Sequence, residues 1–221
     1  MLIGHLAVSF GAKVLEPRAP LSALIAATFG LDLLWPLFLL AGIEVVSVEP
    51  GNTAFTPLAF DSYPWSHSLL LAVAWGGIGA GLTFGLMRNR RIGFLVGAVI
   101  ITHWILDLAT HRPDLPLWPG GPEVGLGLWN SIPATLIIEG SLLIAAVVVF
   151  VRAFAPRDSS GKWFFWTLVG LAGLIWASQP WSPPPPTSNA VAGVALTLWL
   201  LPLWGRWIER HRQALTSHTP Q

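Results

Sequence analysis

The chain has 221 residues, of which 53% are hydrophobic and only 10% are charged, and it contains no cysteine. Average soluble domains carry about 25% charged residues, so this composition indicates an integral membrane protein of one domain. Acidic and basic residues nearly balance, at 11 against 12, which argues against a nucleic-acid partner. The lack of cysteine excludes disulfides, zinc–thiolate sites, iron–sulfur clusters and cysteine nucleophiles.

The sequence holds six apolar runs that reach the length of a transmembrane helix, about 17–25 residues. They cover residues 21–41, 66–87, 92–111, 132–151, 163–179 and 188–206. We therefore predict an all-α fold, a polytopic membrane helical bundle with six long spans and a short N-terminal helix. Residues 1–207 are expected to form this single transmembrane helical domain, and residues 208–221 a short cytoplasmic tail.

The basic residues predict how the chain is oriented in the membrane. All of them except Arg112 lie on one side of the six runs. The positive-inside rule assigns that side, together with the C-terminus, to the cytoplasm. The chain is thus expected to be a multi-pass protein whose connections 42–65 and 112–131 face the outside.

Small residues predict where two of the spans approach each other. Glycines recur every four residues at positions 77, 81 and 85, and again at positions 93 and 97. Such spacing aligns the glycines on one helix face and allows a neighbouring helix to pack closely.

Residues 1–15 are apolar up to Lys13 but are too few for an ordinary span. They could form an amphipathic helix on the cytoplasmic face, or a short helix buried in the bundle. We favour the buried helix, because it would carry His5 toward the other ionisable residues of the apolar runs.

Ionisable side chains inside apolar runs cost about 2.5–3.5 kcal/mol each on insertion scales, and they usually mark a functional site. The densest group is in the segment THWILDLATH, where His103, Asp107 and His111 are spaced by four. This spacing puts the three side chains on one face of a helix. Histidine and carboxylate without cysteine suit zinc, manganese or iron(II), so this face is predicted to ligate metal. The alternative is a polar stripe satisfied by neighbouring helices.

Three more residues of the apolar runs are candidates for the same site. Asp32 has no lysine or arginine in any run core to pair with, so a metal or a histidine cluster is expected to hold its charge, although a lone acid could also relay protons. His67 is a predicted ligand, or else an interfacial residue beside Ser66 as a helix N-cap. Glu139 could be a ligand, an acceptor that fixes a histidine tautomer, or a general base.

The candidate ligands exceed the four that close a tetrahedral zinc site, and they favour two ions that share a carboxylate. They are His5, Asp32, His67, His103, Asp107, His111 and Glu139. The single outward basic residue, Arg112, could bind an anionic oxygen of a substrate, or it could pair with Asp114 and shape the turn.

The order of these motifs resembles a known family. The residues that carry the resemblance are His5, Asp32, the Ser-His-Ser-Leu of residues 66–69, and His103 with Asp107. They look like those of the bacterial membrane-bound metal-dependent hydrolases of the LexA-regulated inner-membrane type, which are grouped with the zinc phospholipase C superfamily. The resemblance implies a main ion held by Asp32, His67, His103 and Asp107. It further implies that His5 shares Asp107 with another ion, while His111 and Glu139 stand where a further ion's ligands fall.

We therefore expect an inner-membrane, metal-dependent hydrolase that acts on a lipid-like phosphoester or another amphiphile from the bilayer. Water activated by one or two divalent ions, zinc before manganese or iron, would be the nucleophile. Glu139 would move a proton and Arg112 would bind the anion, so these two are the predicted catalytic residues. The alternatives are a proton or divalent-metal transporter or channel, and a non-catalytic scaffold that the metal stabilises.

Overall fold

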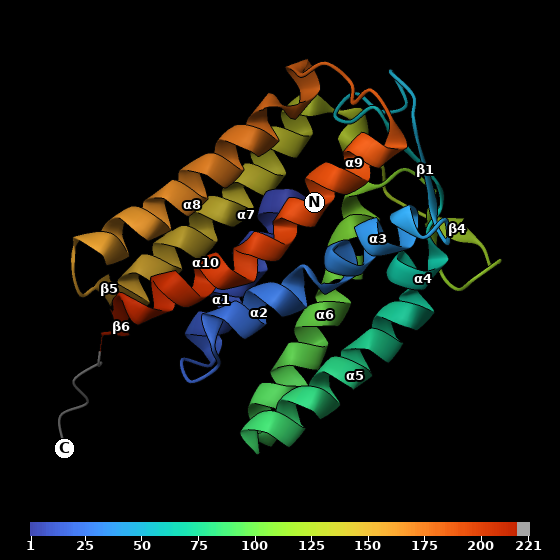
Figure 1. Cartoon of the computed structure of the whole chain (residues 1–221). Helices are drawn as coiled ribbons and strands as arrows, with labels where there is room; N and C mark the ends of the chain where they lie inside the picture. The colour runs from blue at the N-terminus through green and yellow to red at the C-terminus, as the bar shows by residue number, and fades with distance from the viewer. Residues whose placement is uncertain (216–221) are drawn as a thin grey trace.

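The computed structural model describes residues 1–215 and consists mostly of α-helix (Figure 1), which confirms the predicted all-α class. Its helices are α1 (Leu2–Leu15), α2 (Leu21–Thr28), α3 (Gly30–Leu40), α4 (Pro64–His67), α5 (Leu69–Met87), α6 (Arg90–Thr110), α7 (Ile132–Ala153), α8 (Ser159–Ser178), α9 (Ser188–Ala195) and α10 (Leu200–Arg210). Short 3-10 segments lie at η1 (Leu128–Asn130), η2 (Gln179–Trp181) and η3 (Leu196–Trp199).

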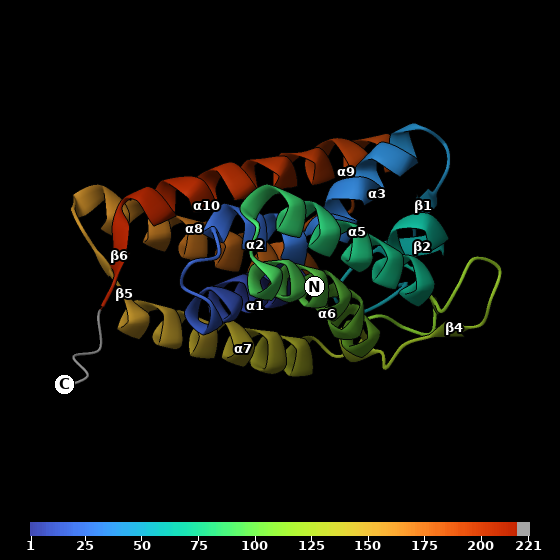
Figure 2. The ribbon, with the colours of Figure 1, turned by 90° about the horizontal axis from the view of Figure 1, so that it is seen from below.

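Three small two-stranded antiparallel sheets, which the sequence analysis does not predict, close the ends of the bundle. Their strands are β1 (Val45–Val48) with β2 (Leu58–Ser62), β3 (Leu115–Pro116) with β4 (Glu123–Val124), and β5 (Phe154–Pro156) with β6 (Arg212–Ala214). The first two sheets are hairpins and lie at one end of the bundle, and the third, whose strands are far apart in the chain, lies at the other (Figure 2). Each is too short to form a core of its own, so the helices carry the fold.

The six predicted spans are found only in part. Within residues 1–215, four helical segments are long and apolar enough to cross a membrane, namely α5, α6, α7 and the continuous stretch Ser188–Arg210. The bent pair formed by α2 and α3 gives a fifth when it is counted as one span. The remaining run, at residues 163–179, corresponds to α8, which has 20 residues but is not among the helices that meet this requirement.

The run that the sequence predicts as one span over 21–41 is broken at Phe29. The axes of α2 and α3 differ by 54° across this residue. Phe29 leaves the helical region at φ −96° and ψ 7°, and Gly30, which is a poor helix former, follows it directly. The break leaves carbonyl groups at the end of α2 without helical partners, and the candidate site uses one of them.

The N-terminal helix α1 lies inside the bundle rather than on its surface. His5, Ser9 and Phe10 are each almost completely buried. The helix packs against α2, α6, α7 and α8. This arrangement agrees with the buried placement of residues 1–15 and brings the start of α1 beside the C-terminal half of α6.

Part of the predicted tail packs onto the bundle. Helix α10 extends to Arg210, and β6 pairs with β5. The Arg212 side chain is buried, where it donates to the carbonyls of Gly161 and Phe154. Residues 208–214 therefore belong to the folded unit, while residues 216–221 of the tail lie outside the described residues.

Candidate metal centre

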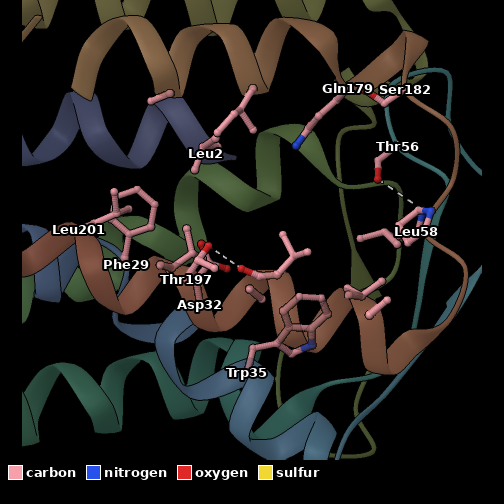
Figure 3. Close-up of a pocket in the computed structure, with 18 of the residues that line it drawn as sticks. Leu2, Phe29, Asp32, Trp35, Thr56, Leu58, Gln179, Ser182, Thr197 and Leu201 are labelled. Atoms are coloured by element: carbon pink, nitrogen blue, oxygen red, sulfur yellow. Dashed lines mark hydrogen bonds between the residues drawn. The ribbon is translucent and has the colours of Figure 1, made fainter. Parts of the chain in front are cut away.

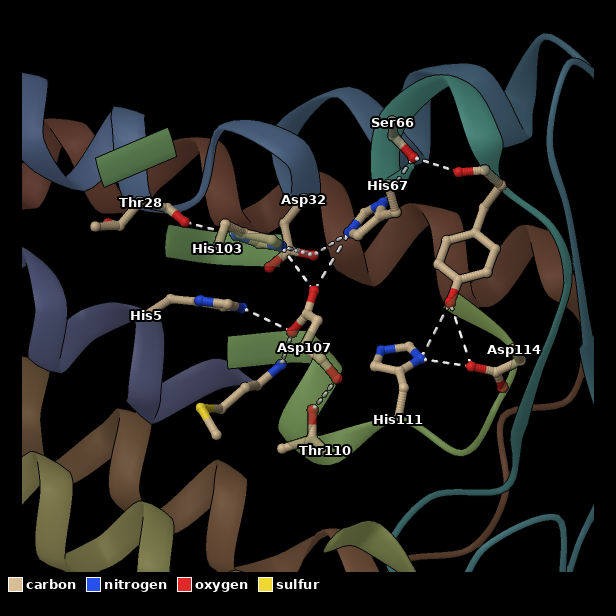
Figure 4. A network of polar contacts seen from close by, with 12 residues as sticks. His5, Thr28, Asp32, Ser66, His67, His103, Asp107, Thr110, His111 and Asp114 are labelled. Atoms are coloured by element: carbon tan, nitrogen blue, oxygen red, sulfur yellow. Dashed lines mark hydrogen bonds and ion pairs between the residues drawn. The ribbon is translucent and has the colours of Figure 1, made fainter. Parts of the chain in front are cut away.

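Three helices, α3, α4 and α6, bring two carboxylates and two imidazoles together (Figure 4). Asp32 lies in the first turn of α3, His67 ends α4, and His103 and Asp107 lie one turn apart on α6. The N-terminal turn of α3 also favours a negative charge, because the helix dipole is positive there. The four residues identified in the sequence as the main site thus converge in space.

The distances among these four side chains match a tetrahedral metal site. His103 Nε2 lies 3.0 Å from Asp107 Oδ2 and 3.8 Å from Asp32 Oδ1. His67 Nε2 lies 3.5 Å from Asp32 Oδ1 and 3.8 Å from Asp107 Oδ2. Ligand atoms at about 2.0–2.1 Å from a zinc ion in tetrahedral geometry stand about 3.3 Å from one another. The observed spacings bracket that value, so one ion could contact all four side chains after small adjustments.

The broken helix orients His103. Its Nδ1 donates to the carbonyl oxygen of Thr28 at 2.6 Å, and this carbonyl is free because α2 ends there. A hydrogen on Nδ1 leaves Nε2 unprotonated and directed at the two aspartates. Metal-binding histidines commonly use such a bond to fix the tautomer and the ring orientation.

A carboxylate that the sequence analysis left out orients His67. His67 Nδ1 lies 2.7 Å from Ser66 Oγ, and Ser66 Oγ donates to Glu44 Oε2 at 2.7 Å. Glu44 Oε1 also accepts from the Ser66 backbone N–H at 2.8 Å, and Glu44 is only 2% exposed. This chain of contacts fixes the same tautomer in His67 as Thr28 does in His103. Ser66 is therefore not a helix N-cap; that role falls to Ser68, which accepts from the Leu71 N–H.

The two oxygens of Asp107 face different partners. Oδ2 faces His67 and His103, whereas Oδ1 lies 3.2 Å from His5 Nε2 and 3.2 Å from the Met1 amino nitrogen. The His5 ring stacks on the His103 ring with centroids 3.7 Å apart. Two groups of possible ligands result, one of His5, His103 and Asp107 and the other of Asp32, His67 and His103. The two groups share His103, and neither contains all four of Asp32, His67, His103 and Asp107, so these side chains would have to close around a single ion to bind it together. We call these four residues the four-residue site, and His5 lies at its edge, next to Asp107.

Unpartnered buried atoms support a bound cation at this place. His103 Nε2 and both ring nitrogens of His5 are buried without a hydrogen bond among the described residues. An unsatisfied buried polar group costs about 1–3 kcal/mol, and two adjacent buried carboxylates repel each other. No lysine or arginine of residues 1–215 forms an ion pair with Asp32 or Asp107. A divalent ion would satisfy the imidazoles and neutralise both acids at once, so the donor set fits a metal.

His111 belongs to a neighbouring network instead of the two ligand groups. Its Nδ1 lies 2.9 Å from Asp114 Oδ1 and 3.2 Å from the Tyr63 hydroxyl, which itself donates to Asp114. Arg112 Nε donates to the other Asp114 oxygen at 3.2 Å, as the alternative interpretation of this arginine expects. Burial, together with the Asp114 carboxylate, raises the pKa of Tyr63, so its hydroxyl remains a donor.

Glu139 is completely buried and is placed by an aromatic residue of the connection between α6 and α7. Its Oε1 accepts from Trp129 Nε1 at 3.3 Å, and its Oε2 has no hydrogen-bond partner among the described residues. Glu139 is not in either group of possible ligands. Its predicted roles as a ligand or a general base remain predictions.

A cavity of about 780 Å³ adjoins the four-residue site (Figure 3). Its walls come from α1, α3, α8, the α9–α10 segment and the connection around Pro57, and most of its lining side chains are apolar. Asp32 is the only charged residue among its described lining residues. The Asp32 side chain is 23% exposed, against 6% for His67 and 3% for Asp107, so the site is accessible from the side of this cavity.

Comparisons with known proteins identify no relative of this chain. No family model matches the chain, and no curated protein or solved structure matches it. The functional argument therefore rests on the geometry of the chain itself.

Proposed function

We propose that this chain is an integral membrane metal-dependent hydrolase that cleaves a lipid-like phosphoester. The observation that carries this proposal is the convergence of Asp32, His67, His103 and Asp107 at spacings that suit one divalent ion. Their order in the sequence resembles the bacterial inner-membrane hydrolases described above, and this resemblance supports an inner-membrane location. The distribution of basic residues supports a cytoplasmic C-terminus.

The chemistry follows from how the chain presents these groups. A divalent ion, with zinc the best fit to two imidazoles and two carboxylates, would supply a Lewis acid and an activated water. His67 and His103 present unprotonated Nε2 atoms because Ser66 and Thr28 hold their Nδ1 sides. The apolar surroundings exclude bulk water and strengthen each electrostatic contact.

Sidedness argues for hydrolysis over transport. On α6 the ligands His103 and Asp107 lie in the last two turns, while the first three turns carry apolar residues after Arg91. A relay or channel needs polar groups along a path to both faces. A site that opens into one apolar cavity instead suits a substrate that arrives and leaves on the same side.

Metal analysis of the purified protein tests the proposal first. We expect about one equivalent of zinc, manganese or iron per chain, or more if His5 and Asp107 hold a second ion. The His103→Ala variant should lose most of the metal and the hydrolysis of bis-p-nitrophenyl phosphate. His211→Ala removes a histidine at the opposite end, where it contacts Asp158, and should leave both measurements unchanged.

The folding of the variants needs its own measurement. Circular dichroism separates loss of metal from loss of structure, and Asp32→Asn offers a second variant because this residue is partly exposed. A chain that binds no zinc, manganese or iron(II) even after loading would overturn the proposal. Ion flux in proteoliposomes that Asp107→Asn abolishes, without any phosphoester cleavage, would replace it with a transporter.

A further inference from the structure

The cavity beside Asp32 has the size and the lining of a small-molecule site. Such sites measure about 300–1,000 Å³ and combine an apolar wall with a few polar groups. Here Asp32 is the charged group among the described lining residues, and Leu6, Phe29 and Trp35 line the cavity with it. The remaining lining residues are mainly leucine, valine and alanine from α8 and the α9–α10 segment, and proline from the connection between α8 and α9.

The mouth of the cavity lies on the surface that faces lipid. Four of its lining residues are large, apolar and exposed, namely Leu171 and Ile175 on α8 at 43% and 48%, Val194 on α9 at 71% and Leu200 on α10 at 59%. Val194 and Leu200 belong to the membrane-length segment Ser188–Arg210. Their exposed surfaces therefore meet hydrocarbon rather than water, and the cavity is open toward the bilayer.

The helix arrangement explains this opening. Helices α8 and α10 pack together near the strand pair β5–β6, and α8 and α9 diverge toward the opposite end (Figure 1). The connection between them contains Pro183, Pro184, Pro185 and Pro186. Consecutive prolines cannot continue a helix and hold the chain extended, so the two helices are joined across a gap that they do not fill. All four prolines line the cavity.

We infer that this cavity binds the hydrocarbon chain of a membrane amphiphile, which enters sideways from the bilayer between α8 and α9. This inference rests on the proposed function, because it takes the four-residue site as the place where the polar group reacts. The chain would extend along α8 and α9–α10 while the scissile group lies at Asp32. With no lysine or arginine among the described lining residues, an anionic group is attracted only to the metal end.

Photolabelling in the membrane tests the inference. The probe is a lysophosphatidylcholine with a diazirine in its acyl chain, added to the zinc-loaded full chain in phosphatidylcholine nanodiscs. We expect labels on peptides of α3, α8 and α9–α10. The Ala172→Phe variant fills the cavity from α8 and should reduce this labelling at least about fivefold, whereas Ala74→Phe, on an exposed position of α5, should leave it unchanged.

A second variant and a kinetic measurement distinguish a filled cavity from a folding defect. If Ala172→Phe does not fold, Leu171→Trp narrows the exposed mouth without changing a buried position. Ala172→Phe should raise the KM for the lysolipid and leave the metal content unchanged. Labels confined to the connection 111–133, which contributes no described lining residue, or labelling that Ala172→Phe and Ala74→Phe affect equally, would overturn the inference. Cavity labelling without metal or turnover would instead contradict the proposed function and leave the chain-binding cavity standing.

Discussion

At the residue scale, the site depends on side chains that never touch the ion. His67 sits on the single turn of α4, which packing alone would hold loosely, and the contact with Ser66 and Glu44 fixes its ring. The buried carboxylate of Glu44 accepts two hydrogen bonds, one from the backbone N–H and one from the hydroxyl of Ser66. Within residues 1–215 the carboxylate has no other hydrogen-bond partner, which indicates that its role is to position Ser66 and, through it, His67.

Glu44→Gln should therefore weaken metal binding without removing a ligand. An amide can still accept one of the two bonds, but it no longer pulls the proton along the path from His67 through Ser66. We expect a zinc affinity lower by about 10–100-fold, the usual effect of losing such a partner, with little change in helical content. Competition with a chelator measures the affinity.

The matched control is Glu49→Gln in the same connection. Glu49 contacts the exposed Ser47 hydroxyl at 3.4 Å and lies away from the cluster, so its variant should bind zinc as the natural chain does. Equal affinities for the natural chain and for Glu44→Gln would show that the Ser66 contact does not orient the ligand.

Sequence patterns identify the candidate ligands better than the groups that orient these ligands by hydrogen bonds. His103 and Asp107 share a helix, so a spacing of four is enough to place them together. Asp32 and His67 are recognised because an ionisable side chain inside an apolar run is energetically costly and usually marks a functional site. Glu44 and the Thr28 carbonyl carry no such signal, since one lies in a connection 22 residues before its partner and the other is a backbone atom. The one hint for Glu44 is its apolar surroundings, Gly-Ile before it and Val-Val after it.

At the element scale, the contact between α5 and α6 shows which glycines matter. A Cβ at Gly97 would come within 2.8 Å of the Gly76 carbonyl oxygen, and one at Gly93 within 2.8 Å of the Ala80 carbonyl oxygen. A Cβ at Gly77, Gly81 or Gly85 would meet no other atom of residues 1–215 within 4 Å. Of the two predicted glycine rows, only the one on α6 makes the close approach. The glycines at 77, 81 and 85 face away from α6. Helix α5 contacts α6 through Gly76 and Gly79 instead.

Gly97→Ala should accordingly separate α5 from α6. The new methyl group meets backbone atoms that cannot rotate away, and overpacking of this kind costs about 1–3 kcal/mol. We expect the Tm in detergent to fall by about 2–10 °C, with weaker metal binding because α6 also carries His103 and Asp107. Differential scanning fluorimetry with and without zinc measures both effects.

Gly81→Ala on the facing helix is the corresponding control. Its methyl group enters open space, and alanine is a better helix former than glycine by about 0.8–1.0 kcal/mol. The Tm should stay the same or rise. A fall in Tm as large as that of Gly97→Ala would mean that the α5 row has a packing partner outside this chain.

Hydropathy predicts where helices lie but not where they bend. Each of the six apolar runs contains helix, yet the run at 21–41 is two helices because Phe29 and Gly30 interrupt it. A hydropathy average over about 20 residues does not reveal a single residue that leaves the helical region. The strands β3 and β4 have only two residues each, which is too short for an alternating pattern of apolar and polar residues to be recognised.

At the scale of the whole molecule, most basic residues lie at one end of the bundle and the candidate metal ligands lie toward the other. Lys13 is buried beside the carbonyls of Pro17 and Ala19 and pairs with Glu209, and Arg91 pairs with Glu16 at the same end. The candidate ligands lie toward the other end, where the β1–β2 and β3–β4 hairpins cover the bundle (Figure 2). This separation follows the distribution of basic residues, so the cavity is expected to open into the outer part of the bilayer.

A cysteine-free chain allows this orientation to be tested one residue at a time. Asp61 and Arg157 are exposed residues of the two opposite ends, and neither lies in a helix. If the positive-inside rule sets the orientation, a membrane-impermeant maleimide added to intact cells should label Asp61→Cys and not Arg157→Cys. After the membrane is permeabilised, both variants should react to a similar extent, which controls for local accessibility. The reverse pattern in intact cells would place the candidate metal centre toward the cytoplasm, and the amphiphile would then have to come from the inner leaflet.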